Sequence, residues 1–418
     1  MKRDIVIIGG GLAGATAAQT LRAEGFTGTI TLLCQENHHP YLRPPLSKDF
    51  LAGREDESSL LPFTLDDYTK QDIELLLGAT AVAIDRDEST VTLAQGTVIK
   101  YGQLLLATGA SPRTLDVPGS DLPGVHYLRT LEDSRHLREA LLRLQPGQQQ
   151  CNVILVGSGW IGMEVAATAR TMGANVTVVG RSRVPLEAAI GPELGTVFME
   201  RHKEAGVVFT TETTVTQIVE GNGRAAGVIT DRGEHLLADL VVVAIGVTPN
   251  TVLAEAAGLT IDNGVLTDPS LRTNDPRILA AGDVANAFHP FTGGNIRSEH
   301  WANAINSGKV AARTMMGKPS RLEEVPYFYT DQFDLGMEYS GYSALAANAK
   351  IVLRGDPASG KFIAFWLIPV SSTKGRLVAG MNVNIWDVQD DIKFLIASGQ
   401  EVQTVQLEDP GVALGELS

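Results

Sequence analysis

The chain has 418 residues, of which 44% are hydrophobic and 20% are charged, as in globular proteins. Its length exceeds one ordinary hydrophobic core, so two or three domains are expected. The net charge of −14 argues against nucleic acid or an anionic membrane as the main partner. Only two cysteines occur, which favours a reducing, cytoplasmic setting without a disulfide framework.

The first apolar stretch, after Lys2 and Arg3, is interrupted by three glycines. It is too short to span a bilayer, so we interpret it as the first strand and helix of a folded domain rather than as a signal peptide. We expect no membrane association.

Two glycine motifs each follow an apolar strand and precede a helical pattern. GGGLAG at 9–14 follows the strand 5–8, and GSGWIG at 157–162 follows the strand 153–156. The first glycine of such a motif permits the bend, the second admits a pyrophosphate, and the third lets the helix pack on the strand. Either motif alone could be a plain glycine-rich turn. Together they predict two dinucleotide sites, and a chain with two dinucleotides is expected to move electrons between them.

The layout around the second motif predicts an inserted domain. Two buried strands that end in glycine turns, 101–110 and 239–246, bracket it. The predicted fold class is α/β, with two Rossmann-like dinucleotide-binding domains and a small α+β C-terminal domain. The boundaries are 1–112 and 248–321 for the first domain, 113–247 for the inserted domain, and 322–418 for the last.

Polar residues after the first motif are candidate ligands. Glu36 lies about 20 residues beyond Gly14, where an acid meets the ribose hydroxyls of a bound dinucleotide. The alternative is a solvated loop carboxylate. His38 and His39 have no further ligand cluster at suitable spacing, so no metal site is expected.

Several further motifs make the chain similar to a known family. They are Arg43-Pro44-Pro45-Leu46-Ser47-Lys48, Ala107-Thr108-Gly109, Gly246 with Pro249-Asn250, Ala281-Gly282-Asp283 and Asp331-Gln332. The chain resembles the flavoprotein ferredoxin reductases that serve oxygenases and bacterial cytochromes P450, in the glutathione-reductase superfamily, with apoptosis-inducing factor as a relative.

The resemblance implies FAD in the first site and NADPH or NADH in the second. The implied FAD residues are Gly9, Gly11, Leu12, Ala13, Gly14, Glu36, Arg43, Lys48, Ala81, Val82, Ala107, Thr108, Gly109, Asp283, Glu299, His300, Trp301 and Tyr329. The implied NAD(P) residues are Gly157, Gly159, Trp160, Ile161, Gly162, Glu164, Arg181, Arg183, Ala244, Ile245 and Gly246.

By the same resemblance, Lys48 lies beside flavin N5 and Glu164 faces the nicotinamide and pairs with Lys48, and both are assigned as catalytic. The alternatives are a surface lysine and an exposed helix residue. Asp283 is expected to bind the flavin ribitol, and the helix that begins at 299–301 is expected to stabilise negative charge on reduced flavin. Trp301 could instead be a core residue.

The sequence lacks a redox-active cysteine pair, and this limits the path by which electrons can leave the flavin. No Cys-x-x-Cys or Cys-x4-Cys pair exists, and Cys34 and Cys151 are expected to pack in cores. Electrons must then leave the flavin directly, which suits a [2Fe–2S] ferredoxin as acceptor. For a basic docking patch, the resemblance suggests Arg297, Lys374 and Arg376; the alternative is that they are ordinary solvated charges.

Two positions depart from the family pattern. Relatives usually carry a glutamate at the position of Gly180, which is followed here by Arg181 and Arg183. Glycine with two guanidiniums favours the 2′-phosphate of NADPH, unless both arginines are only surface charges. Tyr329 stands where relatives often have a tryptophan, which leaves its aromatic role open.

The sequence therefore predicts an FAD-dependent NAD(P)H:ferredoxin oxidoreductase whose ferredoxin serves a P450 or another oxygenase. A rubredoxin reductase or NAD(P)H oxidase of the same fold is the enzymatic alternative. A redox-sensing interaction protein like apoptosis-inducing factor is the alternative from another class. A monomer and a homodimer both remain open.

Overall fold

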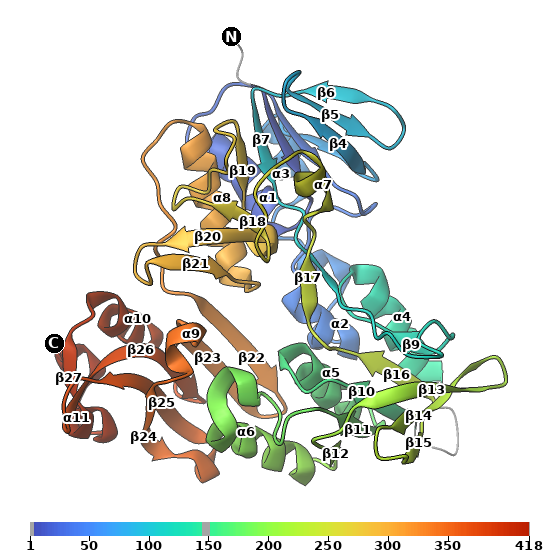
Figure 1. The fold of residues 1–418 in the computed structure, drawn as a ribbon, viewed down its shortest axis with the longest axis vertical. Coiled ribbons are helices and arrows are strands. Elements are labelled where there is room, and N and C mark those ends of the chain that lie inside the picture. Colours follow the sequence, from blue (N-terminus) through green and yellow to red (C-terminus); the bar gives the residue numbers. More distant parts are fainter. Residues whose placement is uncertain (1–3, 144–150, 418) are drawn as a thin grey trace. The chain divides into compact units, whose positions relative to one another are not determined.

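The computed structural model describes residues 4–143 and 151–417. The chain forms two compact units. Unit 1 comprises Met1–Leu42, Glu57–Ser111 and Val247–Pro326, and unit 2 comprises Arg43–Asp56, Pro112–Gly246 and Tyr327–Ser418. The chain therefore enters unit 2 three times, and the C-terminal segment belongs to the same unit as the second glycine motif (Figure 1).

Unit 1 is built on a parallel sheet with the strand order β19-β7-β1-β2-β3. Its strands are β1 (Ile5–Ile8), β2 (Ile30–Leu33), β3 (Glu74–Leu76), β7 (Gln103–Leu106) and β19 (Ile278–Ala280). β1 lies between β2 and β7, with Ile5 opposite Ile30 on one side and Gln103 on the other. Every residue of β1 and β2 is buried, as expected of a parallel sheet covered on both faces.

The two faces of this sheet pack against different elements. Ile7 and Leu105 belong to a core that includes helices α1 (Leu12–Ala23) and α8 (Trp301–Met315). Val6 and Leu104, on the other face, belong to a core with the antiparallel sheet of β4 (Ala81–Asp85), β5 (Thr90–Leu93) and β6 (Val98–Lys100). The period-two alternation of strand side chains thus divides apolar residues between two cores.

Smaller elements complete unit 1. They are η2 (Glu57–Leu60), α3 (Leu65–Lys70), α7 (Val252–Ala256), η3 (Gly282–Val284), and the sheet of β18 (Val265–Thr267), β20 (Ala285–His289) and β21 (Gly294–Arg297). Strands β8 (Ala110–Pro112) and β17 (Val247–Pro249) pair where the chain passes between the units.

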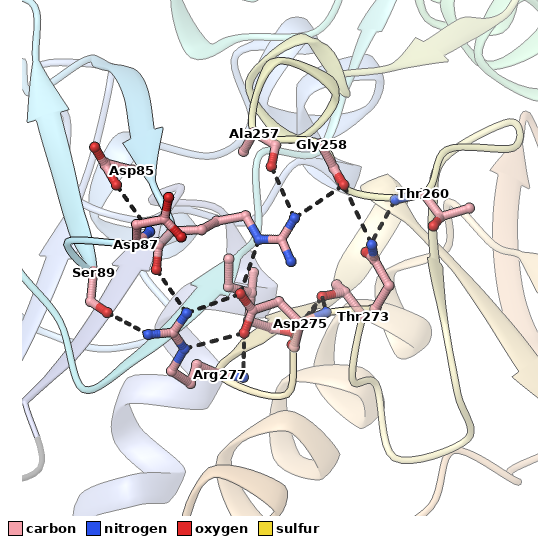
Figure 2. Close-up of polar contacts among 12 residues, drawn as sticks. Asp85, Asp87, Ser89, Ala257, Gly258, Thr260, Thr273, Asp275 and Arg277 are labelled. Atoms are coloured by element: carbon pink, nitrogen blue, oxygen red, sulfur yellow. Dashed lines mark hydrogen bonds and ion pairs between the residues drawn. The ribbon is translucent and has the colours of Figure 1, made fainter.

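A buried carboxylate ties the β4–β5 turn to the segment before β19. Asp275 is 3% exposed and accepts hydrogen bonds from Arg86 Nε at 3.0 Å and from Arg277 (Figure 2). Arg277 also reaches Ser89 Oγ at 2.7 Å. Burial opposes ionisation of Asp275, but the hydrogen bonds from Arg277 and Arg86 outweigh it and lower its pKa.

Unit 2 repeats the dinucleotide architecture. Its parallel sheet has the order β12-β11-β10-β16-β9. The strands are β9 (Val125–His126), β10 (Asn152–Val156), β11 (Asn175–Val179), β12 (Val208–Thr210) and β16 (Leu240–Val243). Helices α4 (Leu131–Arg143), α5 (Trp160–Thr171) and α6 (Glu187–Glu204) contribute to one core, and the sheet of β13 (Val215–Gly221), β14 (Arg224–Thr230) and β15 (His235–Leu237) covers the other face.

The C-terminal part of unit 2 is an antiparallel sheet of order β22-β23-β26-β25-β24, with β27 paired to β26. The strands are β22 (Tyr327–Gln332), β23 (Leu335–Gly341), β24 (Lys350–Asp356), β25 (Lys361–Pro369), β26 (Lys374–Val383) and β27 (Glu401–Gln403). The accompanying helices are α9 (Ser343–Ala346), α10 (Gln389–Ser398) and α11 (Thr404–Glu408), with the short turns η4 (Pro357–Ser359) and η5 (Leu414–Glu416).

A buried arginine binds the backbone of residues 406–412, near the C-terminus. Arg354 on β24 is 7% exposed, and its guanidinium donates to the carbonyl oxygens of Leu407 at 2.7 Å, Gln406 at 2.8 Å and Val412 at 2.9 Å. These bonds satisfy the buried cation.

The expected fold class, two Rossmann-like sheets with an α+β C-terminal domain, is confirmed. Within the described ranges, no helix has the length and apolar character needed to cross a membrane.

Candidate functional site

The two predicted glycine turns have nearly the same geometry. Gly9 and Gly157 adopt φ of +122° and +109°, in the region that favours glycine. A Cβ on Gly9 would lie 2.0 Å from the carbonyl oxygen of Ala107, and one on Gly157 would lie 2.2 Å from that of Ala244. Each first glycine therefore lets its turn pass close to the end of the neighbouring parallel strand.

The middle glycines have a different reason to lack side chains. A Cβ on Gly11 or Gly159 would meet no atom within 4 Å, so nothing in the protein itself demands glycine there. Both residues are N-caps without a side-chain cap, so the first amides of α1 and α5 are left for a ligand. An open cradle at a bare helix N-terminus fits a dinucleotide pyrophosphate in each unit.

The third glycines serve packing. A Cβ on Gly14 would lie 2.2 Å from the carbonyl oxygen of Gly9, and one on Gly162 would lie 2.5 Å from that of Gly157. Between the second and third glycines, Leu12 and Ala13 begin α1, and Trp160 and Ile161 begin α5.

Other expected FAD residues of unit 1 lie near the first turn or on loops tied to it. Glu36 follows β2 and accepts a hydrogen bond from Tyr41 Oη at 2.5 Å. Thr108 Oγ1 donates to Asn250 O at 2.8 Å, and the Asn250 amide donates back to Thr108 O at 2.8 Å. The Ala107-Thr108-Gly109 and Pro249-Asn250 motifs are thus one hydrogen-bonded structure. Tyr41 was not singled out from the sequence.

The Ala281-Gly282-Asp283 motif packs against the start of α1. Gly282 adopts φ of +73°, and a Cβ there would lie 3.0 Å from Ala13 Cβ. Its amide donates to Ser307 Oγ at 2.9 Å, a contact that sequence reasoning missed because Ser307 carries no motif signal. Asp283 is 9% exposed. Ala81 and Val82 begin β4, and Val82 is 53% exposed.

Helix α8 begins as expected, with His300 as N-cap. Desolvation lowers the pKa of His300 to about 4 against the opposing effect of Asp283, so the ring is neutral near pH 7. Trp301 is 38% exposed, so the core alternative for it is wrong. Arg297 pairs with Glu299 at 2.6 Å and has a side chain only 12% exposed, which removes it as an exposed docking charge.

The pairing of Lys48 with Glu164, implied by the resemblance, is present in unit 2. Lys48 Nζ lies 2.8 Å from Glu164 Oε2, and the two residues are 9% and 3% exposed. Thr330 Oγ1 donates to Glu164 Oε1 at 2.6 Å, and Ser47 Oγ donates to Oε2. Both carboxylate oxygens are therefore bound, as a buried charge requires. Neither alternative, a surface lysine or an exposed helix residue, holds.

Aromatic and cationic groups extend this site. Lys48 Nζ lies 5.8 Å from the centre of the Tyr329 ring, and Tyr329 is 36% exposed. Burial, reinforced by Asp331, raises the pKa of Tyr329, so the phenol is neutral. Arg43, expected along FAD, donates to the carbonyl oxygen of Arg129.

The expected NAD(P) residues separate into those that pack and those that face solvent. The ring of Trp160 packs 4.9 Å from Phe328, whereas Ile161 is 47% exposed. Gly246 adopts φ of +99° and accepts a hydrogen bond from the amide of Arg113. Ala244 supports Gly157, as described above, and precedes the half-buried Ile245.

The two arginines beyond β11 differ. Arg183 pairs with Glu187 at 3.5 Å, whereas Arg181 is exposed and forms no ion pair with any residue in the described ranges. A Cβ on Gly180 would lie 2.7 Å from Ser158 Oγ. Of the two arginines in this loop, Arg181 is therefore the one whose guanidinium is not held in an ion pair within the described ranges.

The two cysteines do not form a disulfide. Cys34 belongs to unit 1 and Cys151 to unit 2, and both are buried and free. Burial, with Glu36 for Cys34 and Asp239 for Cys151, raises the pKa of each thiol to about 12. Such thiols are inert at neutral pH, so the expected packing role is confirmed.

Comparison with known proteins decides the family. The family model described as pyridine nucleotide-disulphide oxidoreductase matches residues 3–308, and the model described as reductase C-terminal matches residues 327–418. The chain belongs to the pyridine nucleotide-disulphide oxidoreductase family.

Relatives of this oxidoreductase align over most of its length. It is 41% identical to rhodocoxin reductase of Rhodococcus erythropolis over 362 residues, which cover 87% of this chain and 83% of the relative. It is 39% identical to the anthranilate 1,2-dioxygenase system ferredoxin–NAD(+) reductase component of Burkholderia cepacia, with 98% of each chain covered. The putidaredoxin reductase chain of the covalent putidaredoxin reductase–putidaredoxin complex superposes with a TM-score of 0.92 at 34% identity, covering 99% of this chain and 98% of that one.

These relatives confirm the expected enzyme class. The oxidoreductase is of the ferredoxin reductase type, and membership of the family implies FAD and a nicotinamide dinucleotide as its cofactors. The fit of the two open glycine cradles agrees with that pair of cofactors.

Proposed function

We propose that this oxidoreductase passes electrons from NADPH, through FAD, to a small [2Fe–2S] ferredoxin that serves a cytochrome P450 or another oxygenase. The observation that carries the proposal is the pair of open glycine cradles, one in each unit, in a chain without a usable thiol pair. The solved relative in complex with putidaredoxin and the relative from a dioxygenase system support a ferredoxin as acceptor. The buried, free cysteines suit a reducing cytoplasm.

FAD in the cradle of unit 1 supplies a carrier that accepts a hydride and releases electrons singly. The residues proposed to hold it are those of the Gly9–Gly14 turn, with Glu36 on the ribose and Asp283 on the ribitol chain. The bare N-terminus of α8 offers amide hydrogens to negative charge. Burial lowers the pKa of His300, so we assign that stabilisation to the amides rather than to an imidazolium.

In unit 2, Gly157, Gly159 and Gly162 are proposed to hold the nicotinamide dinucleotide, and Lys48 with Glu164 is proposed to serve the hydride step. Lys48 holds a positive charge where electron density increases, and Glu164 offsets the cost of burying that charge. Tyr329 is proposed to shield this charge from water. Lys374 and Arg376, at the start of β26, are the remaining candidates for contact with an acidic ferredoxin.

The preference for NADPH rests on the loop after β11. Gly180 lacks the carboxylate that would repel a 2′-phosphate, and the exposed Arg181 is free to bind it. The NAD(+)-linked relative from Burkholderia cepacia shows that the alternative dinucleotide occurs at 39% identity.

One assay separates the candidate functions. The purified holoenzyme is reduced with NADPH or NADH, and cytochrome c reduction is followed with and without added [2Fe–2S] ferredoxin. We expect ferredoxin-dependent turnover that is faster with NADPH. Full-rate reduction without a carrier would contradict the proposal, and rapid oxygen consumption would identify an oxidase.

A rubredoxin reductase is the second candidate because rubredoxin-NAD(+) reductase of Pseudomonas putida is 36% identical over 349 residues. Substituting rubredoxin for ferredoxin in the same assay tests it directly. A protein that is reduced by NAD(P)H but transfers electrons slowly to every carrier would instead favour a redox-sensing role.

A further inference from the structure

Strand β22 of the C-terminal domain meets helix α5 of the dinucleotide domain in a fixed register. Phe328 packs on Trp160 with ring centres 4.9 Å apart, and Thr330 donates to Glu164 at 2.6 Å. Residues two apart on a strand share one face, and residues four apart on a helix share one face. One apolar contact and one polar contact therefore fix the strand along the helix.

The Glu164 carboxylate is bound by two hydroxyls as well as by Lys48. Ser47 and Lys48 bind Oε2, and Thr330 alone binds Oε1 among the described residues. An ionised carboxylate only accepts hydrogen bonds, so the Thr330 hydroxyl must be the donor. Thr330 is 1% exposed, so no water replaces this bond without rearrangement.

Gln332, of the Asp331-Gln332 motif to which the proposed reaction gives no role, contacts this hydroxyl. Gln332 is fully buried, and its amide nitrogen donates to Thr330 Oγ1 at 3.2 Å. The Thr330 oxygen thus accepts from Gln332 while its single hydrogen is donated to Glu164. Gln332, Thr330 and Glu164 form a hydrogen-bonded chain from the C-terminal sheet to the buried ion pair.

We propose that Thr330 is a positioning residue for the reaction, which fixes the Glu164 carboxylate and so makes the C-terminal domain part of the hydride-transfer machinery. The inference rests on the proposed function, because it assigns Thr330 to the same Lys48–Glu164 site. A packing role alone would require only the shape of threonine, which valine reproduces. The hydroxyl is what the proposal requires.

The test compares Thr330→Val with Thr330→Ser in the flavin-loaded enzyme by stopped-flow reduction with NAD(P)H. We expect Thr330→Val to lower the limiting rate of flavin reduction about tenfold, the effect of losing one hydrogen bond to a charged group, with little change in the dinucleotide dissociation constant. Thr330→Ser should restore most of the rate. Thr267→Val is the matched control, because Thr267 is a buried strand residue whose hydroxyl has no partner in the described structure.

A second readout does not depend on turnover. The carboxylate stretching band of Glu164, isolated as the infrared difference between the wild type and Glu164→Gln in the oxidised protein, should shift in Thr330→Val and return in Thr330→Ser. If Thr330→Val fails to fold or to bind flavin, Thr330→Ala removes the hydroxyl without placing a methyl group against the carboxylate.

The outcomes are distinct. A Thr330→Val or Thr330→Ala enzyme that is reduced at the wild-type rate, or a serine variant as slow as the valine variant, overturns the inference. A change confined to the dissociation constant also overturns it, since that would mark a binding role. If the wild type itself is not reduced by NADPH or NADH, the proposed function fails instead, and the infrared comparison still reports on the hydroxyl contact.

Discussion

Lys48 Nζ lies 2.8 Å from Glu164 Oε2, and the two charges come from segments 116 positions apart that fold into one unit. Neither residue is more than 9% exposed. A buried ion pair contributes little net stability. Removing one partner, however, leaves the other charge buried and unpaired, where water cannot solvate it. The energetic consequence of losing either partner alone is therefore large.

We predict that Lys48→Met lowers the free energy of unfolding by about 3 kcal/mol, whereas Lys48→Met combined with Glu164→Gln loses much less than the sum of the single changes. Chemical denaturation of the four proteins measures this coupling. Lys203→Met is the matched control, since Lys203 and Glu200 form an exposed pair worth at most about 1 kcal/mol. Additive effects of the two buried changes would contradict the prediction.

Substitutions at two glycines of the first turn are expected to affect different properties, one the folding of the protein and the other its binding of FAD. Gly9→Ala places a Cβ 2.0 Å from Ala107 O at a φ of +122°, so we expect loss of the folded protein. Gly11→Ala meets no protein atom, so we expect a folded protein that purifies without flavin. Circular dichroism measures the first effect and flavin absorbance the second. A yellow Gly11→Ala protein with wild-type FAD affinity would show that the cradle does not hold the pyrophosphate.

The loop after β11 predicts an unequal effect of its two arginines. Arg181→Gln should lower kcat/KM for NADPH by about tenfold and leave NADH nearly unchanged, because a guanidinium–phosphate contact is lost. Arg183→Gln should have a smaller effect, because Arg183 is already paired with Glu187. Steady-state kinetics with both dinucleotides gives the ratios. A wild-type enzyme that prefers NADH would refute the assignment.

The sequence was sufficient for the dinucleotide architecture because its signals are local. A glycine turn between a buried strand and a helix is readable within 9–14, and the structure gives each glycine a steric or open-space reason. The small α+β C-terminal domain was likewise expected, and the structure gives it an antiparallel sheet.

The sequence could not give contacts between distant segments. Nothing near Thr330 or Ser47 indicates that both hydroxyls bind Glu164, and Ser307 beneath Gly282 has no motif of its own. Arg297 was considered as a docking charge because sequence does not reveal ion pairs, and its neighbour Glu299 neutralises it. Such relationships depend on tertiary placement rather than on residue type.

The Asp275 cluster of unit 1 predicts a stability effect far from the glycine motifs. Asp275→Asn leaves Arg86 and Arg277 without their common counter-charge (Figure 2). We expect a loss of about 2 kcal/mol in unfolding free energy, moderated because both arginines are partly exposed. Glu88→Gln, an exposed change in the adjacent turn, is the control and should change stability by less than about 0.5 kcal/mol. Equal effects of the two variants on the unfolding free energy would show that the Asp275 cluster does not stabilise the fold.

His300 gives the protein a predicted acid-sensitive step. Folding lowers the pKa of this ring from 6.5 to about 4, mainly through desolvation, so the folded state favours the neutral form. The associated stability is complete above pH 6.5 and is lost as the pH falls from 6.5 towards 4, because the unfolded chain binds the proton first. His300→Gln should therefore flatten the fall in unfolding free energy across this window, although His126, His202 and His289, whose pKa values burial also lowers, keep part of the slope. Denaturation midpoints of the flavin-free protein at a series of pH values measure the difference, with the exposed His235→Gln as control. A His300→Gln protein with the full wild-type slope would mean that folding does not lower the pKa of His300.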